Sequence, residues 1–272
     1  AAHEFLRFID ELLAENHQLI YTTHSPFMVE SEKLSRVRMV EDRGKTEGAK
    51  VSEEVLSTDK ATLFPLQGAL GYEIAQNLFV SPNNLIVEGT SDYAYLRIMS
   101  DYLACEEGRV SLDERWTIVP VGGADLIPTF VALLGHHLDM TVLVDARTSD
   151  HQKLCRLAQE GYIGNDKIIA IGEMIGNDAA NIEDLFQPED YLLLFNNAFA
   201  ENVHEEDLTG TDSIVNQLCR HFSWDGFNHG RPADELLRER ESILPEISAE
   251  ALEAFERLFV RINKTLDPSA YG

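Results

Sequence analysis

The sequence has few cysteines and no long apolar segment. Its 3 cysteines, Cys105, Cys155 and Cys219, are widely spaced and form no C-x-x-C pair. Such a sparse, odd set argues against a disulfide framework or a cysteine-based zinc site and is typical of a reducing cytoplasm. No apolar run approaches the roughly 18 residues of a membrane-spanning helix, and the first residues lack the pattern of a secretory signal. We therefore expect a cytoplasmic protein with no membrane partner.

Positive charge is also scarce. The 272 residues include 22 Lys and Arg against 47 Asp and Glu, which gives a formal net charge of −25. Such a surface repels phosphate and argues against unaided binding to nucleic acid. Two interpretations are open. The carboxylates form a solvated acidic surface, or some of them converge on divalent cations, which would invert the local field.

Strands and helices alternate regularly after about residue 81. Short apolar runs typical of buried strands occur at 85–87, 116–119, 141–144 and 167–171. Helical periodicity occurs between them at 91–104, 124–138 and 150–160. This alternation predicts an α/β fold, a parallel sheet flanked by helices. A helical domain is expected after it, with helices at 189–200, 211–222, 232–243 and 248–263.

The first 80 residues have a different pattern. They predict a helix over 4–14, a short strand over 19–22, a hairpin of 37–41 with 51–56, and mainly helix over 60–80. The chain is therefore expected to have three parts, residues 1–80, 81–188 and 189–272.

Acidic residues and a glycine pair follow the predicted strands. Glu88 and Asp92 follow the first strand, Gly122 and Gly123 the second, and Asp145 the third. Ligands bind beyond the carboxyl ends of strands in open parallel sheets, and carboxylates gathered there suit Mg²⁺ or Mn²⁺. The glycines would let a backbone or a phosphate approach closely. The alternative is purely local, with Asp92 capping the next helix and Asp145 in a turn.

Two of these segments resemble the motifs of Toprim domains. Residues 85–92 (LIVEGTSD) are similar to the first motif, an apolar strand followed by Glu-Gly and then Asp. Residues 142–145 (VLVD) are similar to the start of the second. The resemblance implies a Toprim-type fold over 81–188, acid–base or metal work for Glu88, and metal binding by Asp92 and Asp145.

The resemblance extends to the OLD family (overcoming lysogenisation defect) of ATPase-coupled nucleases. Residues 19–26 (LIYTTHSP) resemble the switch-histidine motif that ends an ABC-type ATPase core, with His24 as the histidine. Residues 181–186 (NIEDLF) resemble the third acidic motif of that family, which adds Glu183 and Asp184 as metal ligands. Residues 1–80 would then be the end of an ATPase domain and a connector.

The sequence lacks a phosphate loop of the form G-x-x-x-x-G-K-[ST]. Gly44-Lys45-Thr46 imitates its end, but position 39 is Met. We therefore expect ATP to act only through a missing N-terminal ATPase part, and His24 to be a remnant of its switch. A homodimer is expected for the full-length protein.

Two further positions follow from the resemblance. The second motif of the family carries Asp-x-Asp, whereas this chain has Asp145-Ala146-Arg147. Either Asp150 substitutes for the missing ligand, or the ligand comes from Glu183 or Asp184. Arg147 either points away and pairs with Asp150 or contacts a DNA phosphate, and we favour the phosphate contact. The C-terminal lysine of the family corresponds to Lys264, with Arg261 as second choice. The alternatives are a solvated charge, or a cation that complements the helix dipole.

The leading hypothesis is an endonuclease that hydrolyses DNA with two Mg²⁺ or Mn²⁺ ions, where Ca²⁺ can occupy the site without turnover. Glu88 is either a metal ligand or the general base. The second hypothesis is a non-catalytic Toprim scaffold that binds DNA or a protein partner. A topoisomerase-like or primase-like protein is the third, although each would need parts that are not evident in the sequence.

Overall fold

The computed structural model describes residues 6, 8–9, 13–14, 17–23, 36–44, 48–52, 82–136, 138–145 and 149–266. The chain divides into two compact units, Ala1–Phe79 and Val80–Gly272. Within the described ranges, no helix has the length and apolar content needed to cross a membrane.

The first unit contains the predicted hairpin. Strands β1 (Met39–Asp42) and β2 (Ala49–Ser52) pair antiparallel. The strand expected over 19–22 is wrong, because residues 18–23 adopt no regular structure. Ile20 there is 85% exposed, and an apolar run forms a strand only where a neighbour pairs with it and buries it. Most of the predicted helix over 4–14 and all of that over 60–80 lie outside the described residues.

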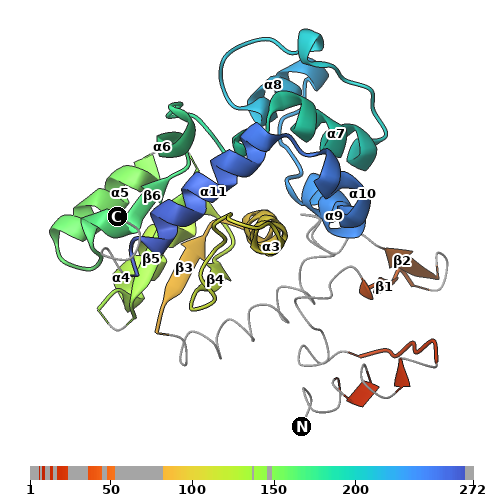
Figure 1. Ribbon diagram of the computed structural model, residues 1–272, viewed down its shortest axis with the longest axis horizontal. Helices are drawn as coiled ribbons and strands as arrows, with labels where there is room; N and C mark the ends of the chain where they lie inside the picture. Colours follow the sequence, from red (N-terminus) through yellow and green to blue (C-terminus); the bar gives the residue numbers. More distant parts are fainter. Residues whose placement is uncertain are drawn as a thin grey trace. The chain divides into compact units, whose positions relative to one another are not determined.

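The second unit is built on a four-stranded parallel sheet (Figure 1). Its strands are β3 (Asn84–Val87), β4 (Thr117–Pro120), β5 (Met140–Val144) and β6 (Ile168–Ala170), in the order β4-β3-β5-β6. Every residue of β3, β5 and β6 is buried, as near-continuous apolar runs require in a sheet covered on both faces. The predicted parallel α/β class is confirmed, and each strand lies within two residues of its expected position.

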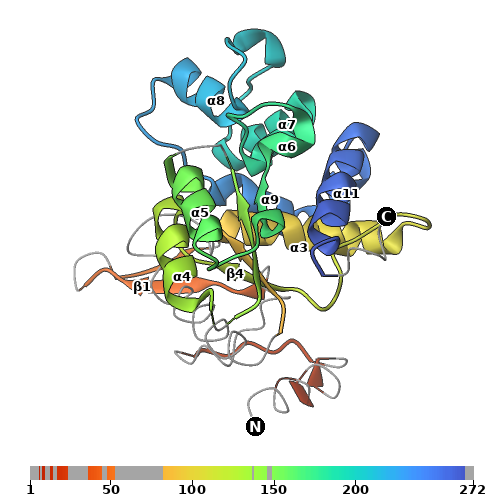
Figure 2. The same ribbon diagram turned by 90° about the vertical axis from the view of Figure 1, so that its left-hand side faces the viewer.

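Helices cover both faces of this sheet (Figure 2). One face carries α3 (Thr90–Cys105) and α11 (Ala249–Asn263), and the other carries α4 (Ile127–Leu134) and α5 (Ser149–Gln159). Adjacent strands β3 and β5 are therefore followed by helices on opposite faces. Such a switch point opens a crevice at the carboxyl ends of the two strands, where α/β proteins bind ligands.

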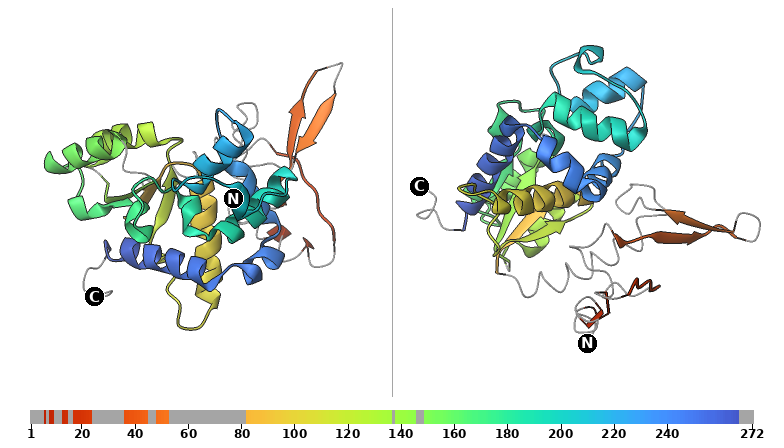
Figure 3. Two further views of the ribbon diagram at one scale, coloured as in Figure 1. Left: turned by 90° about the horizontal axis from the view of Figure 1, so that it is seen from above. Right: turned by 45° about the vertical axis from the view of Figure 1, so that its right-hand side comes forward.

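The remaining helices follow the sheet in the sequence (Figure 3). They are α6 (Gly172–Ile175), α7 (Pro188–Phe199), α8 (Ile214–Phe222), α9 (Gly230–Arg238) and α10 (Arg240–Ile243). Short 3₁₀ helices are η4 (Ala124–Leu126), η5 (Asn165–Lys167), η6 (Ile182–Leu185), η7 (Glu205–Asp207) and η8 (Leu244–Glu246). The single helix expected over 232–243 is two helices, because the backbone leaves helical geometry at Glu239 (φ −105°, ψ 23°).

A buried aromatic cluster joins these helices to the sheet. The ring of Phe186 lies 5.4 Å from that of Tyr95 on α3, 4.9 Å from Phe255 on α11 and 6.3 Å from Tyr191 on α7. All four side chains are buried, and each contributes a large apolar area to the core. This shared core explains why residues after 189 belong to the same compact unit as the sheet.

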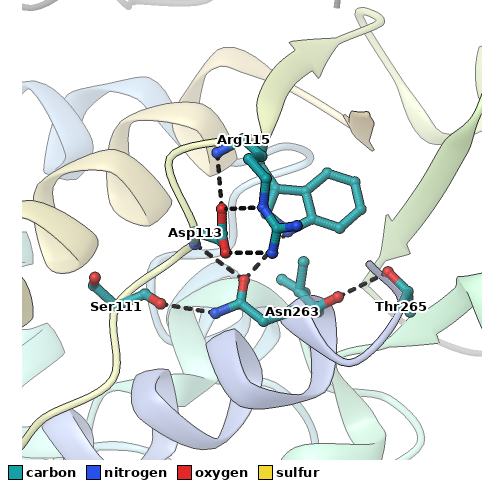
Figure 4. A network of polar contacts seen from close by, with 7 residues as sticks. Ser111, Asp113, Arg115, Asn263 and Thr265 are labelled. Carbon is teal, nitrogen blue, oxygen red and sulfur yellow. Dashed lines mark hydrogen bonds and ion pairs between the residues drawn. The ribbon is translucent and has the colours of Figure 1, made fainter. Parts of the chain in front are cut away.

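The end of α11 is fixed by a second set of contacts (Figure 4). Asn263 is fully buried. Its amide nitrogen donates to the carbonyl of Ser111 at 2.9 Å, and its Oδ1 accepts from the backbone amide of Asp113 at 3.0 Å and from the indole of Trp116 at 3.2 Å. The loop before β4 and the last turn of α11 are therefore held by one side chain.

Candidate functional site

Two carboxylates meet at the switch point of the sheet. Glu88 directly follows β3, and Asp145 directly follows β5. The backbone amide of Asp145 donates to Oε1 of Glu88 at 3.0 Å. The expectation that acidic residues from different strands converge at this edge is therefore met by these two.

Asp92 lies in the first turn of α3 and faces the same carboxylates. It is 6% exposed, and its Oδ2 accepts from the backbone amide of Gly89 at 2.8 Å. Asp92 thus caps α3, as the local interpretation expected, and it also lies beside the other carboxylates. Burial, followed by the negative charge of Glu88, raises the pKa of Asp92 from 3.8 to about 7, even though the bond from Gly89 acts in the opposite direction.

The 3₁₀ helix η6 adds a third acidic element. The backbone amide of Ile182 donates to Oδ1 of Asp145 at 3.1 Å, and Glu183, the next residue, is completely buried. Burial, then the charges of Asp92, Glu88 and Glu183, raise the pKa of Asp145 well above its usual value. These four carboxylates form the acidic cluster, which consists of Glu88, Asp92, Asp145 and Glu183.

Glu183 contacts a histidine that the sequence did not suggest. His229 lies immediately before α9, and its Nδ1 is 2.6 Å from Oε1 of Glu183. The other oxygen of Glu183 is buried and has no hydrogen-bond partner among the described residues. Burial acts to lower the pKa of His229, but Glu183, Asp92 and Glu88 outweigh it, so the pKa is raised. A lone histidine in a helical region carries no spacing signal, so sequence reasoning had no means of finding it.

Asp184, the next residue, has a structural role. Its Oδ1 accepts from the backbone amide of Ile214 at 2.7 Å, and its Oδ2 accepts from that of Asn181 at 2.7 Å. Burial raises its pKa to about 6, against the effect of these two bonds. Asp184 therefore holds the start of η6 and the start of α8, and of the two acidic neighbours only Glu183 belongs to the acidic cluster.

The glycine pair after β4 holds the backbone of the site. The amides of Gly122 and Gly123 donate to the carbonyl of Glu88 at 2.9 and 2.8 Å. Both residues have positive φ, +92° and +147°, which side chains rarely tolerate. Because both N–H groups are engaged by Glu88, they position that residue, and the structure does not show them directed at a phosphate.

Lys264 and Arg261 lie at the opposite edge of the sheet. Thr265, next to Lys264, hydrogen-bonds Thr141 near the start of β5 at 2.9 Å, whereas Asp145 follows the end of that strand, roughly 13 Å away along it. Arg261 donates to a carbonyl of η5, just before β6 begins. The structure does not bring either cation to the acidic cluster.

Three expected site residues cannot be placed. His24 and Arg147 lie outside the described residues, and so does the side chain of Asp150. Their assignments stay predictions.

The acidic cluster has the donor chemistry for a hard divalent cation. Carboxylate oxygens are the ligands that Mg²⁺ and Mn²⁺ prefer, and a cation would relieve both the mutual repulsion and the unpartnered oxygen of Glu183. Nevertheless, in the described part of the chain no three His, Cys, Asp or Glu side chains are already arranged to hold a metal ion. The residues therefore suit the ion by chemistry and charge, and they would have to close around it.

The fold and the site define an α/β protein with a four-stranded parallel sheet, an acidic cluster at the carboxyl edge of that sheet, and helices after it. The structure is similar to the C-terminal region of the OLD protein of Xanthomonas campestris pv. campestris, at 17% identity and a TM-score of 0.43, over 72% of this chain and 100% of that one. It is also similar to the C-terminal region of the Burkholderia pseudomallei OLD protein, at 14% identity and a TM-score of 0.35, over 66% of this chain and 96% of that one. No family model and no curated protein matches the chain. At these identities and TM-scores the likenesses assign no residue roles.

Proposed function

We propose that this chain is a divalent-metal-dependent endonuclease that hydrolyses phosphodiester bonds of DNA. The observation that carries the proposal is the acidic cluster at the switch point. Asp92 and Glu183 are buried there beside Glu88 and Asp145, and burial together with the neighbouring negative charges raises the pKa of Asp92 and of Asp145. Proteins keep such mutually repelling groups at functional sites far more often than in ordinary cores. Its position at the carboxyl edge of a parallel sheet is where a substrate can reach it.

Glu88, Asp92, Asp145 and Glu183 would hold Mg²⁺ or Mn²⁺. The bound ions would supply an activated water and charge stabilisation for the leaving oxygen. The chain's own contribution is positioning. Oε1 of Glu88 is fixed by the amide of Asp145, Oδ1 of Asp145 by Ile182, and Oδ2 of Asp92 by Gly89. Glu88 would serve either as one of these ligands or as the general base that accepts a proton from the attacking water.

DNA as substrate and Mg²⁺ or Mn²⁺ as cofactor are proposed from the motifs at 85–92, 142–145 and 181–186 together with this geometry. Coupling to an ATPase and a homodimer of a longer protein are proposed from the motif at 19–26. With a net charge of −25, DNA binding should depend on the divalent ion and should weaken steeply with salt.

A non-catalytic scaffold is the second candidate. One observation favours it: no preformed three-ligand metal group exists in the described part of the chain. A scaffold would bind DNA or a protein partner without cutting, and its binding would survive chelation.

Incubation with supercoiled plasmid in EDTA, Mg²⁺, Mn²⁺ or Ca²⁺ tests the proposal. Nicked or linear product is expected with Mg²⁺ or Mn²⁺ only. Glu88→Gln and Asp145→Asn should abolish cleavage yet remain folded, because neutral side chains remove repulsion inside the acidic cluster. Glu160→Gln, an exposed residue beyond α5, is the control that should cut normally. Tight DNA binding in EDTA with no cleavage in any ion would favour the scaffold instead.

A further inference from the structure

We infer that His229 is a positioning residue of the acidic cluster, delivered to it by the helical region. The inference rests on the proposed function and adds to it a residue from outside the three acidic motifs. His229 and Glu183 are 46 positions apart in the sequence, yet their side chains lie 2.6 Å apart.

The contact orients Glu183 in a defined way. Oε1 of Glu183 is engaged by His229, and Oε2 is buried without a partner in the described residues. A carboxylate held through one oxygen presents the other in a fixed direction. Outer partners of this kind hold metal-ligating side chains in their binding orientation. The oxygen that lacks a partner is thus the one we assign to the cation.

The fold holds the histidine in place. His229 precedes α9, which packs against α3 and α7, and Gly230, the next residue, is buried. The ring of Phe227 meets the imidazole edge to face at 5.1 Å. The imidazole is still 37% exposed, so it lies at the border between the buried carboxylate and solvent.

His229 thereby connects the helices after residue 189 to the acidic cluster. Asp92 lies in the first turn of α3, and α9, which His229 immediately precedes, packs against α3. A shift of α9 would withdraw the partner of Glu183. The helices after residue 189 would therefore complete the site, in addition to covering the sheet.

The test is a calorimetric titration of the whole chain with Mn²⁺ alone, paired with plasmid cleavage. His229→Ala should weaken Mn²⁺ binding by about 10–100-fold and lower kcat, as loss of an outer partner does. His229→Asn keeps an N–H donor near the position of Nδ1 and should restore most of both. His221→Ala is the control, since that histidine is exposed and its Nδ1 lies 3.2 Å from a carbonyl of η7 and not beside a carboxylate of the acidic cluster.

A double-mutant cycle separates positioning from general stability. In a Glu183→Gln background, His229→Ala should cause little further loss of Mn²⁺ affinity, because the partner that it positions is already altered. Melting in EDTA confirms that each variant is folded. The inference about His229 would be overturned, with the proposed function intact, if His229→Ala bound Mn²⁺ and cut DNA like the wild type. It would also be overturned if a folded His229→Asn recovered neither Mn²⁺ affinity nor cleavage. A wild-type chain that neither binds Mn²⁺ nor cuts DNA would overturn the proposed function and this inference together.

Discussion

The carboxylate of Glu88 accepts a hydrogen bond from the backbone amide of Asp145 at 3.0 Å. Glu88 directly follows β3 and Asp145 directly follows β5, so this hydrogen bond joins the ends of two adjacent strands. The carbonyl of Glu88 in turn accepts from both glycines after β4. The position of Glu88 is thus set by three strands at once, and this precision is what catalytic groups require.

Lys264→Ala should leave plasmid cleavage and Mn²⁺ affinity unchanged. The residue caps the end of α11 at the amino edge of the sheet, opposite the acidic cluster. Its removal affects only an exposed charge near a helix end. Cleavage rates measured beside Glu88→Gln decide the point, and a comparable loss in both variants would restore Lys264 to the site.

Glu183 and Asp184 should separate into a functional and a structural residue. Asp184→Ala leaves the amides of Asn181 and Ile214 without acceptors and should cost about 1–3 kcal/mol of unfolding free energy. Glu183→Gln should change stability little but lose Mn²⁺ affinity. Urea unfolding in EDTA and calorimetry measure the two effects. An unstable Glu183→Gln with normal metal binding would contradict this division.

Asp92 should make the metal-free protein less stable as pH rises from about 4 to about 7. Its pKa is 3.8 when unfolded and about 7 when folded, so the folded state binds the proton more tightly across this window. Stability from this group is therefore present at low pH and is lost by neutral pH, by an amount on the order of 4 kcal/mol. Asp92→Asn should flatten the slope in EDTA, and saturating Mn²⁺ should reverse it. A wild-type slope in Asp92→Asn would exclude the effect.

Gly122→Ala and Gly108→Ala form a matched pair. Their φ values are +92° and +86°, so alanine should strain both backbones by about 1–3 kcal/mol. Of these two glycines, Gly122 donates to the carbonyl of Glu88, at 2.9 Å, and Gly108 does not. We expect similar losses of melting temperature but slower cleavage for Gly122→Ala alone. Equal cleavage rates would show that the glycine loop does not set the position of Glu88.

Asn263→Ala should destabilise the chain by about 2–4 kcal/mol, because Trp116 and the amide of Asp113 lose a buried acceptor. Denaturant unfolding compared with Asn202→Ala, whose amide is exposed, gives the difference. Cleavage per folded molecule should be unaffected, since this network lies away from the acidic cluster. A loss of stability no greater than in the control would mean that α11 is held by its apolar face alone.

The sequence by itself determined the sheet and most of the acidic cluster. Apolar runs such as 85–87 and 141–144 indicate strands buried on both faces, and their alternation with helical segments favours a parallel sheet covered by helices. Because parallel strands end at one edge, Glu88 and Asp145 were expected at the same edge of the sheet, and the strand order β4-β3-β5-β6 then made them neighbours. Asp92 followed from the same motif through the start of α3.

Only the tertiary structure decided the rest. Asp184 and Glu183 are neighbours with the same chemistry, and the choice between them depends on which backbone amides the folded chain brings to each. Lys264 looked equivalent to a catalytic lysine until the packing of α11 placed it at the far edge. His229 has no local signal, since its role depends on α9 packing against α3 and α7. Local patterns fix which segments are buried, but contacts between distant segments are set by packing, and those contacts choose the residues of the site.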